Sequence, residues 1–299
     1  MWRLLVGGVL LIAGGATTAV SAQGFDQVAI RTVPVSDGIA MLEGAGGNIG
    51  VSYGVDGVLV IDDQFAPLAE KIKAALGELS AAPVRFVLNT HWHHDHTGGN
   101  EILGGEGAVI VAHENARRRL TTTQFVKGFD RDYPPYSRAG LPVVTFTRDI
   151  TFHLNDDEIH VFHVADAHTD GDAVVHFRQA NVLHAGDLFF NGFYPFLDVW
   201  NGGTIDGLIA AVERLLELSD GATRIIPGHG PLAKRPDLVK YRDMLRTVRH
   251  RVAARRAAGE SLEQIIAARP TADLDPTWGQ GPLSVDLFLS LVYETLDAP

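Results

Sequence analysis

Five side chains that could bind a metal ion follow one short apolar run of the chain. Residues 84–100 read VRFVLNTHWHHDHTGGN, and the candidate ligands are His91, His93, His94, Asp95 and His96. These polar side chains could not all be buried in a continuing strand without partners, so we expect the strand to end near Leu88 and a loop to follow. Imidazole nitrogens and carboxylate oxygens suit zinc and related cations better than calcium or magnesium, which prefer oxygen ligands. The segment therefore predicts a loop that binds a transition metal.

The spacing within this loop supports the same interpretation. In an extended backbone alternate side chains point to one side, so His91 and His93 can face one cation while Trp92 faces away. Gly98 and Gly99 allow a tight path into a short helix that begins near Asn100. A solvated histidine-rich loop is the alternative, but composition alone would not require this spacing or this strand-to-helix setting.

Three further candidates lie downstream, each after a short apolar run or beside glycine. They are His168 in VADAHTDGDA, Asp187 in VLHAGDLFF and His229 in RIIPGHGPL. The pattern His91-x-His93-x-Asp95-His96, followed by these three residues, resembles the metallo-β-lactamase fold superfamily of metallohydrolases. The resemblance covers about residues 39–232, most of the chain after its first segment.

The resemblance implies a fold, a ligand set and a cofactor. The fold would be an α/β protein, an αβ/βα four-layer sandwich in which the ligand-bearing loops meet at one edge of two packed sheets. The cofactor would be two Zn²⁺ ions per chain. One ion would be held by His91, His93 and His168, the second by Asp95, His96 and His229, and Asp187 would bridge both.

A dinuclear site of this kind would activate water rather than a side-chain nucleophile. One zinc ion already lowers the pKa of a bound water to about 7, and a water shared by two ions loses its proton more readily. We therefore expect a metal-bridging hydroxide to attack an amide or ester-type bond, with Asp95 as the catalytic residue that binds metal and orients the nucleophile. The chain has no cysteine, which agrees with this expectation.

The substrate is less well defined by the sequence. Asp187 stands where the cysteine-bearing β-lactamases carry a thiolate, and Leu188-Phe189-Phe190 lacks the lysine with which those enzymes bind a substrate carboxylate. The pattern is closer to glyoxalase II-like thioesterases and lactonases, which share the bridging aspartate. β-Lactamase activity proper and a noncatalytic accessory role in a periplasmic oxidation system are alternatives. Redox di-iron members of the fold usually carry glutamate where His93 stands.

The first residues predict export. Residues 1–22 combine Arg3, an apolar core and small residues before Ala22, the pattern of a cleaved secretory signal. An uncleaved anchor is the alternative, but Thr17 and Thr18 shorten the apolar run below spanning length, so we expect no stable membrane span after cleavage. We expect a periplasmic or secreted protein in which residues 23–299 form the hydrolase domain, stabilised by core burial and metals without disulfides. A net charge of −11 argues against nucleic acid as a partner, so we expect a small-molecule substrate.

Two strand-rich stretches, each followed by helices, must position the ligand loops. We expect strands at residues 27–35, 39–42, 48–53, 57–61, 84–88 and 108–112, then at 143–146, 151–154, 159–164, 173–177, 182–185 and 224–226, with helices at 67–79, 113–120 and 204–218 and cover helices from about 236. Asp62 and Asp63 are either turn residues or acids that orient a ligand imidazole.

Two aromatic loops are candidate walls of a substrate pocket. Residues 121–142 fit neither a helical nor a strand period, and residues 189–200 read FFNGFYPFLDVW after the expected bridging carboxylate. We expect Tyr136, Tyr194 and Trp200 to contact substrate. The alternative is that these aromatic side chains only pack the loops against the body of the protein.

Overall fold

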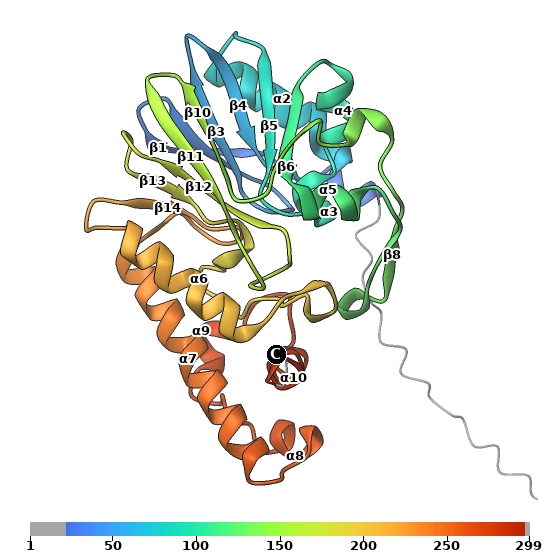
Figure 1. Cartoon of the computed structure of the whole chain (residues 1–299), viewed down its shortest axis with the longest axis vertical. Coiled ribbons are helices and arrows are strands. Elements are labelled where there is room, and N and C mark those ends of the chain that lie inside the picture. Colours follow the sequence, from blue (N-terminus) through green and yellow to red (C-terminus); the bar gives the residue numbers. More distant parts are fainter. Residues whose placement is uncertain (1–21, 297–299) are drawn as a thin grey trace, which may run out of the picture.

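The computed structural model describes residues 22–296 and shows two β-sheets that face each other with helices on both outer sides (Figure 1). This is the four-layer arrangement expected from the resemblance, and it is confirmed. The expected signal segment lies, apart from Ala22, outside the described residues.

The first sheet has seven strands in the order β1-β2-β3-β4-β5-β6-β9. Antiparallel hairpins form its first part, and the strands from β4 to β9 run parallel. Helices α2 (Ala69–Leu79), α4 (Asn100–Gly105) and α5 (Glu114–Leu120) lie in the connections between the parallel strands, as parallel pairing requires. The strand bounds are β1 Arg31–Ser36, β2 Ile39–Glu43, β3 Ile49–Gly54, β4 Gly57–Ile61, β5 Val84–Asn89, β6 Val109–His113 and β9 Val144–Phe146.

The second sheet has six strands in the order β10-β11-β12-β13-β14-β15. Helix α6 (Ile205–Leu218) connects the parallel pair β13 and β14, and its N-cap Thr204 accepts a hydrogen bond from the Gly207 N–H. Helices α7 (Arg235–Ala257), α8 (Leu262–Ala267), α9 (Asp275–Trp278) and α10 (Val285–Thr295) follow. The strand bounds are β10 Asp149–Leu154, β11 Asp157–Val164, β12 Asp172–Phe177, β13 Val182–His184, β14 Arg224–Ile226 and β15 Ala233–Lys234.

Three apolar clusters fill the spaces between the layers. One joins the two sheets through residues such as Leu88 of β5 and Val175 of β12. A second packs Ile72 of α2 against the outer face of the first sheet. A third packs Leu208 of α6 and Leu245 of α7 against the second sheet and α10. Because both faces of each sheet are covered, its central strands are apolar on both sides.

The structure differs from the sequence-based expectation mainly in short elements. Residues 121–142, expected to be irregular, contain a hairpin of β7 (Gln124–Val126) and β8 (Arg131–Tyr133). Helix α9 and strand β15 were not expected, because elements of two to four residues show no readable period. A further short helix, α3 (His94–Thr97), lies inside the metal-ligand loop, and α1 (Ala22–Phe25) precedes β1.

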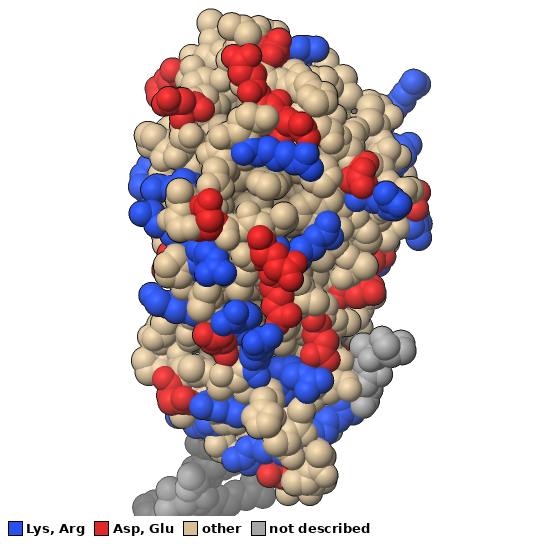
Figure 2. Space-filling model, turned by 60° about the vertical axis from the view of Figure 1, so that its left-hand side comes forward, with Lys and Arg blue, Asp and Glu red and all other residues tan. Residues whose placement is uncertain are grey.

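Charged side chains of both signs are interspersed on the face drawn in Figure 2. Several arginines of α7 contribute ion pairs with acids of neighbouring elements, including Arg249 with Asp206 and Arg251 with Asp273. Within residues 22–296, none of the helices combines the length and apolar character that crossing a membrane requires.

Candidate metal centre

Loops that follow four different strands bring the seven expected ligands together. The ligand atoms form two groups, and within each group all of them lie within 4.8 Å of one another. The first group is His91, His93, His168 and Asp187, and the second is Asp95, His96 and His229. The loops follow β5, β11, β13 and β14, which end at the same edge of the two sheets.

Asp187 lies between the two groups. Its Oδ2 is 3.5 Å from Nε2 of His168 and 3.4 Å from Nε2 of His229. Its Oδ1 is 3.0 Å from Nε2 of His96. One carboxylate thus faces both groups, which is the position of a bridging ligand.

A glycine makes room for this carboxylate. A Cβ atom added to Gly228 would lie 2.1 Å from Oδ1 of Asp187, closer than any real contact allows. Gly228 immediately precedes His229, so the turn that delivers this imidazole also passes beside the bridging carboxylate. The close approach explains why glycine stands next to the ligand histidine.

Hydrogen bonds from the far side of each ring orient His93 and His168. Nε2 of His93 donates to Oδ2 of Asp198 at 2.9 Å, which leaves Nδ1 to face the cluster. Nδ1 of His168 donates to the carbonyl oxygen of Phe196 at 2.9 Å, which leaves Nε2 free to bind. A second partner of this kind fixes the tautomer and the direction of a metal-binding imidazole.

Asp62 performs the same role for the other early histidines. Its Oδ2 lies 2.7 Å from Nδ1 of His96, and it also accepts the hydroxyl proton of Thr90 at 2.7 Å. The Thr90 oxygen lies 3.0 Å from Nδ1 of His91, so this hydroxyl oxygen can accept a hydrogen bond from the Nδ1–H group of that ring. Asp62 therefore orients ligands, whereas Asp63 accepts the Gly99 N–H at 2.8 Å and fixes the turn after them.

The electrostatics of the cluster favour ligand protonation states. Burial lowers the pKa of His91 and lowers the pKa of His168 to about 4, so both rings are neutral at pH 7. Burial would raise the pKa of Asp187, but the charges of neighbouring imidazoles outweigh burial and lower that pKa well below its usual value. Burial lowers the pKa of His229, yet Asp187 and Asp95 outweigh it and raise the pKa to about 9. The protons held by His229 and its neighbours are those that a bound cation would displace.

A buried atom without a partner shows that this donor set suits a metal. Nε2 of His91 is buried and has no hydrogen-bond partner among the described residues. Leaving such a group unsatisfied costs about 1–3 kcal/mol, and native proteins rarely do so without a ligand, water or function. Imidazole nitrogens and carboxylate oxygens converging on this point fit a divalent metal of the zinc type.

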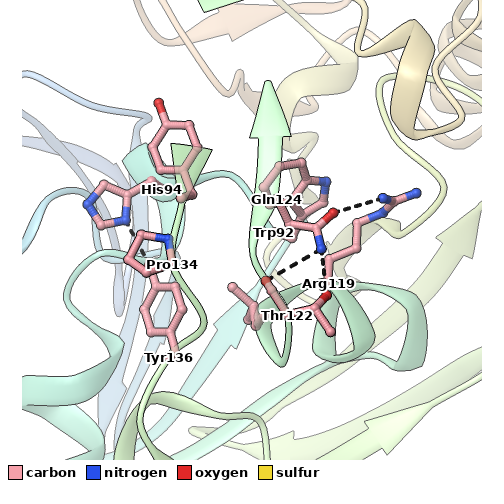
Figure 3. Close-up of a pocket in the computed structure, with 9 residues that line it drawn as sticks. Trp92, His94, Arg119, Thr122, Gln124, Pro134 and Tyr136 are labelled. Atoms are coloured by element: carbon pink, nitrogen blue, oxygen red, sulfur yellow. Dashed lines mark hydrogen bonds between the residues drawn. The ribbon is translucent and has the colours of Figure 1, made fainter. Parts of the chain in front are cut away.

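A pocket lies beside the ligand cluster, and Tyr136 is part of its wall. Figure 3 shows His94, Pro134 and Tyr136 on one side and Trp92, Gln124 and Arg119 on the other. None of the seven ligands lines it, so it is separate from the cluster. The Tyr136 hydroxyl lies 2.9 Å from Nδ1 of His94 and 2.9 Å from Oγ1 of Thr97. Tyr136, expected to contact substrate, braces the helix that carries Asp95 and His96.

The structure separates the other two expected substrate contacts. Tyr194 is only 1% exposed, stacks on Phe288 and donates its hydroxyl proton to Oδ1 of Asp275 at 2.9 Å. This corrects the expectation for Tyr194, because its polar end is satisfied inside the helical layer. Trp200 is 37% exposed, and Nζ of Lys127 lies 4.8 Å from its ring centroid.

Sequence analysis missed two acids that shape the site. Asp198 orients His93, and Asp172 accepts the backbone N–H groups of His168 at 2.7 Å and Thr169 at 2.8 Å. A signal existed for Asp198, since it is the single carboxylate in the apolar run FYPFLDVW and a buried carboxylate needs a partner. Nothing in the sequence near Asp198 identifies that partner.

Comparison with protein families gives one clear match. The family model described as the metallo-beta-lactamase superfamily matches residues 47–248, which is more than half of the chain and contains all seven ligands. Two solved structures have a similar fold. The metallo-beta-lactamase from Pontibacter korlensis has a TM-score of 0.59 at 20% identity and covers 73% of this chain and 99% of that one. DIM-1 metallo-beta-lactamase has a TM-score of 0.57 at 17% identity, with 74% of this chain and 99% of that chain covered.

Curated relatives point to hydrolases by name. A hydroxyacylglutathione hydrolase of Polaromonas sp. is 30% identical over 61% of this chain and 65% of its own length. A probable metallo-hydrolase, YqgX, of Bacillus subtilis is 28% identical over 58% of this chain and 83% of its own. The acyl-coenzyme A thioesterase MBLAC2 of Gallus gallus is 27% identical over 47% of this chain and 54% of its own. This chain thus spans less than two thirds of the Polaromonas and Gallus relatives.

Proposed function

Because this chain belongs to the metallo-β-lactamase superfamily, we propose that it is a dinuclear zinc hydrolase that cleaves an acyl bond of the ester, thioester or amide type. The observation that carries the proposal is the position of Asp187, whose two oxygens face both ligand groups. A single metal site would not need a buried carboxylate shared between two sets of imidazoles. The names of the hydrolase and thioesterase relatives support the same reaction class.

The residues of the chain divide the work of such a reaction. Two divalent cations held by the seven ligands would supply Lewis acidity and lower the pKa of a water molecule. Asp95 is the most exposed ligand side chain, at 29%, and its Oδ2 lies 3.3 Å from Nε2 of His229. With one oxygen toward the ligand cluster, Asp95 is placed to accept a hydrogen bond from the attacking water and to orient it. Asp62 and Asp198 hold buried ligand histidines in place through hydrogen bonds.

The chemistry of Asp187 favours acyl esters and thioesters over β-lactams as substrates. A carboxylate stands here where the cysteine-bearing β-lactamases carry a thiolate, and Leu188-Phe189-Phe190 offers no cation for a β-lactam carboxylate. The two β-lactamase structures share less than 25% identity with this chain, so their likeness supports the fold only.

We also propose that the protein is exported to the periplasm or secreted. The support is the signal-like composition of residues 1–22. The mass of the protein recovered from the producing cell tests this directly. Loss of residues 1–22 is expected, and a full-length protein recovered from the cytoplasm would contradict export.

Metal analysis combined with a substrate screen tests the proposed reaction. We expect close to two zinc ions per chain and, in a screen of nitrocefin, lactones, thioesters and phosphodiesters, hydrolysis of at least one acyl compound. Asp187→Asn keeps the shape of the side chain but removes its charge, so it should lower both metal content and turnover. Turnover of phosphodiesters alone, or a metal-free protein that remains fully active, would contradict the proposal.

A further inference from the structure

The hairpin formed by β7 and β8 exposes large apolar side chains beside the metal centre. Gln124 pairs with Tyr133 at its base, and the 3₁₀ turn Lys127–Phe129 forms its tip. Phe125 is 49% exposed and Phe129 is 57% exposed. In Figure 1 the hairpin extends beyond the edge of the first sheet toward the segment that precedes α6. Exposed aromatic side chains grouped in this way are typical of binding surfaces.

One layer of side chains separates the tip of the hairpin from the metal ligands. The Phe129 ring centroid lies 4.8 Å from that of Phe196. The Phe196 ring lies in turn 6.0 Å from the His93 ring and 6.1 Å from the His168 ring. A Cβ on Gly128 would lie 2.5 Å from the Phe196 ring, so the tip is seated tightly on Phe196. The hairpin is therefore continuous with the wall of the metal centre.

The base of the hairpin contacts the metal-ligand loop as well. The Tyr133 ring centroid lies 5.6 Å from that of His94, the residue between ligands His93 and Asp95. Both ends of the hairpin thus border the cluster. A molecule bound at the exposed ligand Asp95 would have the hairpin as its neighbour.

Lys127 and Arg131 are cationic residues of the hairpin. Each lies near an aromatic ring, and neither is paired with an acid among the described residues. Nζ of Lys127 lies 4.8 Å from the Trp200 ring centroid, and Cζ of Arg131 lies 5.2 Å from that of Tyr133. Among the residues that the structure describes, neither cation forms a hydrogen bond or an ion pair. On α7, by contrast, Arg246 pairs with Glu213. Cations held over rings without a counter-charge can still bind an anion.

We propose that residues 124–133 recognise the substrate, and that this substrate is an acyl compound with an apolar chain and a second, anionic group. The inference rests on the proposed function and narrows its substrate class. Phe129 and Trp200 would contact the apolar chain, and Lys127 and Arg131 would bind the anion. In the reaction the water oxygen bonds to the acyl carbon, the bond to the leaving group breaks and the leaving group takes up a proton. The anionic group is only bound and remains unchanged.

The hairpin also carries two exposed acids, Asp130 and Asp132. Among the described residues neither acid forms an ion pair with Lys127 or Arg131, so both cations keep their donors available to the carboxylate of a ligand.

Matched p-nitrophenyl esters test the inference with the zinc-loaded protein. p-Nitrophenyl hydrogen adipate and p-nitrophenyl hexanoate have acyl chains of equal length and differ in a terminal carboxylate. We expect kcat/KM to be about tenfold higher for the adipate ester, the effect of one charge-assisted contact. The double variant Lys127→Gln/Arg131→Gln should abolish this preference, because it should lower kcat/KM for the adipate ester to the value for the hexanoate ester. Lys240→Gln, on α7 and 73% exposed at its side chain, is the matched control and should change neither ester.

The apolar part of the inference has its own variant. Phe129→Ser should lower kcat/KM for both six-carbon esters by roughly tenfold relative to p-nitrophenyl acetate, because the short acetyl group does not reach the hairpin. Equal kcat/KM for the adipate and hexanoate esters would overturn the inference and leave the hydrolase function intact.

Binding of the product acids distinguishes a failure of this inference from a failure of the proposed hydrolase function. Calorimetry of adipate and hexanoate with the zinc-loaded protein should show about tenfold tighter binding of adipate, lost in the double variant, whether or not any ester is turned over. No turnover with this difference present would overturn the proposed function alone. A dimer that Phe129→Ser dissociates, with unchanged ester preference and affinities, would make the hairpin a self-association surface and overturn the inference.

Discussion

Asp198 accepts a hydrogen bond from Nε2 of His93 at 2.9 Å across 105 residues of sequence. Asp198 is fully buried, and the side-chain amide of Asn201 donates to both of its oxygens, at 2.9 and 2.8 Å. Arg119 of α5 in turn donates to the Asn201 carbonyl at 3.2 Å and forms a bidentate pair with Asp170. A continuous set of hydrogen bonds therefore leads from α5 to a metal ligand and fixes which nitrogen of His93 faces the cluster.

Replacing Asp198 should weaken metal binding more than it changes the fold. In Asp198→Asn the amide can no longer stabilise the Nε2–H tautomer through a charge, so we expect zinc affinity to fall by about 10- to 100-fold. Competition titration with a chelating dye measures this affinity. Asp243→Asn, on the exposed face of α7, is the matched control and should bind zinc like the parent protein. Unchanged affinity in Asp198→Asn would show that Asp198 does not orient His93.

Gly228 should be required for the bridging carboxylate. In Gly228→Ala the new methyl group would lie 2.1 Å from Oδ1 of Asp187, so we expect this carboxylate to be displaced and the zinc content to fall below that of the parent protein. Gly221→Ala is the control, because nothing lies within 4 Å of its added Cβ. Elemental analysis of both variants after identical loading compares them. Full zinc content in Gly228→Ala would mean that the loop moves without affecting Asp187.

His113 should make the stability of the protein depend on pH. Its Nε2 donates to the Thr147 carbonyl at 3.1 Å, its Nδ1 accepts the Asn115 N–H at 3.3 Å, and its ring stacks on His163 at 3.7 Å. Burial, followed by the charge of His163, lowers the pKa of His113 below its usual value. A proton on Nδ1 would face another N–H group, which explains why the neutral form is favoured.

The sign of this effect follows from proton binding. Below the unfolded pKa of about 6.5 the unfolded chain binds a proton at residue 113 more readily than the folded protein, so the contribution to stability is present above that pH and is lost as pH falls. Urea unfolding of zinc-loaded protein from pH 7.5 to 5 should show a smaller loss of unfolding free energy for His113→Gln than for the parent. Parallel curves for the two proteins would contradict this role of His113.

Tyr194 should matter for stability and not for turnover. Tyr194→Phe removes one hydrogen bond to the buried carboxylate of Asp275, whose Oδ2 already has no hydrogen-bond partner among the described residues. We expect the free energy of unfolding to fall by about 1–3 kcal/mol. Trp200→Phe, at a partly exposed position, is the comparison and should change stability little. If Tyr194→Phe lowered kcat and left stability unchanged, Tyr194 would have to act at the substrate site.

The sequence by itself determined the ligand set and the elements that carry it. His91, His93, Asp95 and His96 could be recognised because ligand types at fixed local spacing follow directly from the backbone geometry of a strand and its loop. Strands such as β4 and helices such as α6 agree with the sequence-based expectation because apolar periods and caps are also local. The family model and the fold of related structures confirm the resemblance that these residues indicated.

Only the tertiary structure decided which side chains support the ligands and which lie in the core. Asp198 and Tyr194 both belong to the run FYPFLDVW, yet one orients His93 and the other packs against α10 in the helical layer. The contact between the hairpin at residues 124–133 and Phe196 also joins segments that lie far apart in the chain. Such partnerships depend on how distant elements pack, and the packing of the two sheets and their helices is a property of the whole chain, whereas residue type and spacing are properties of each segment.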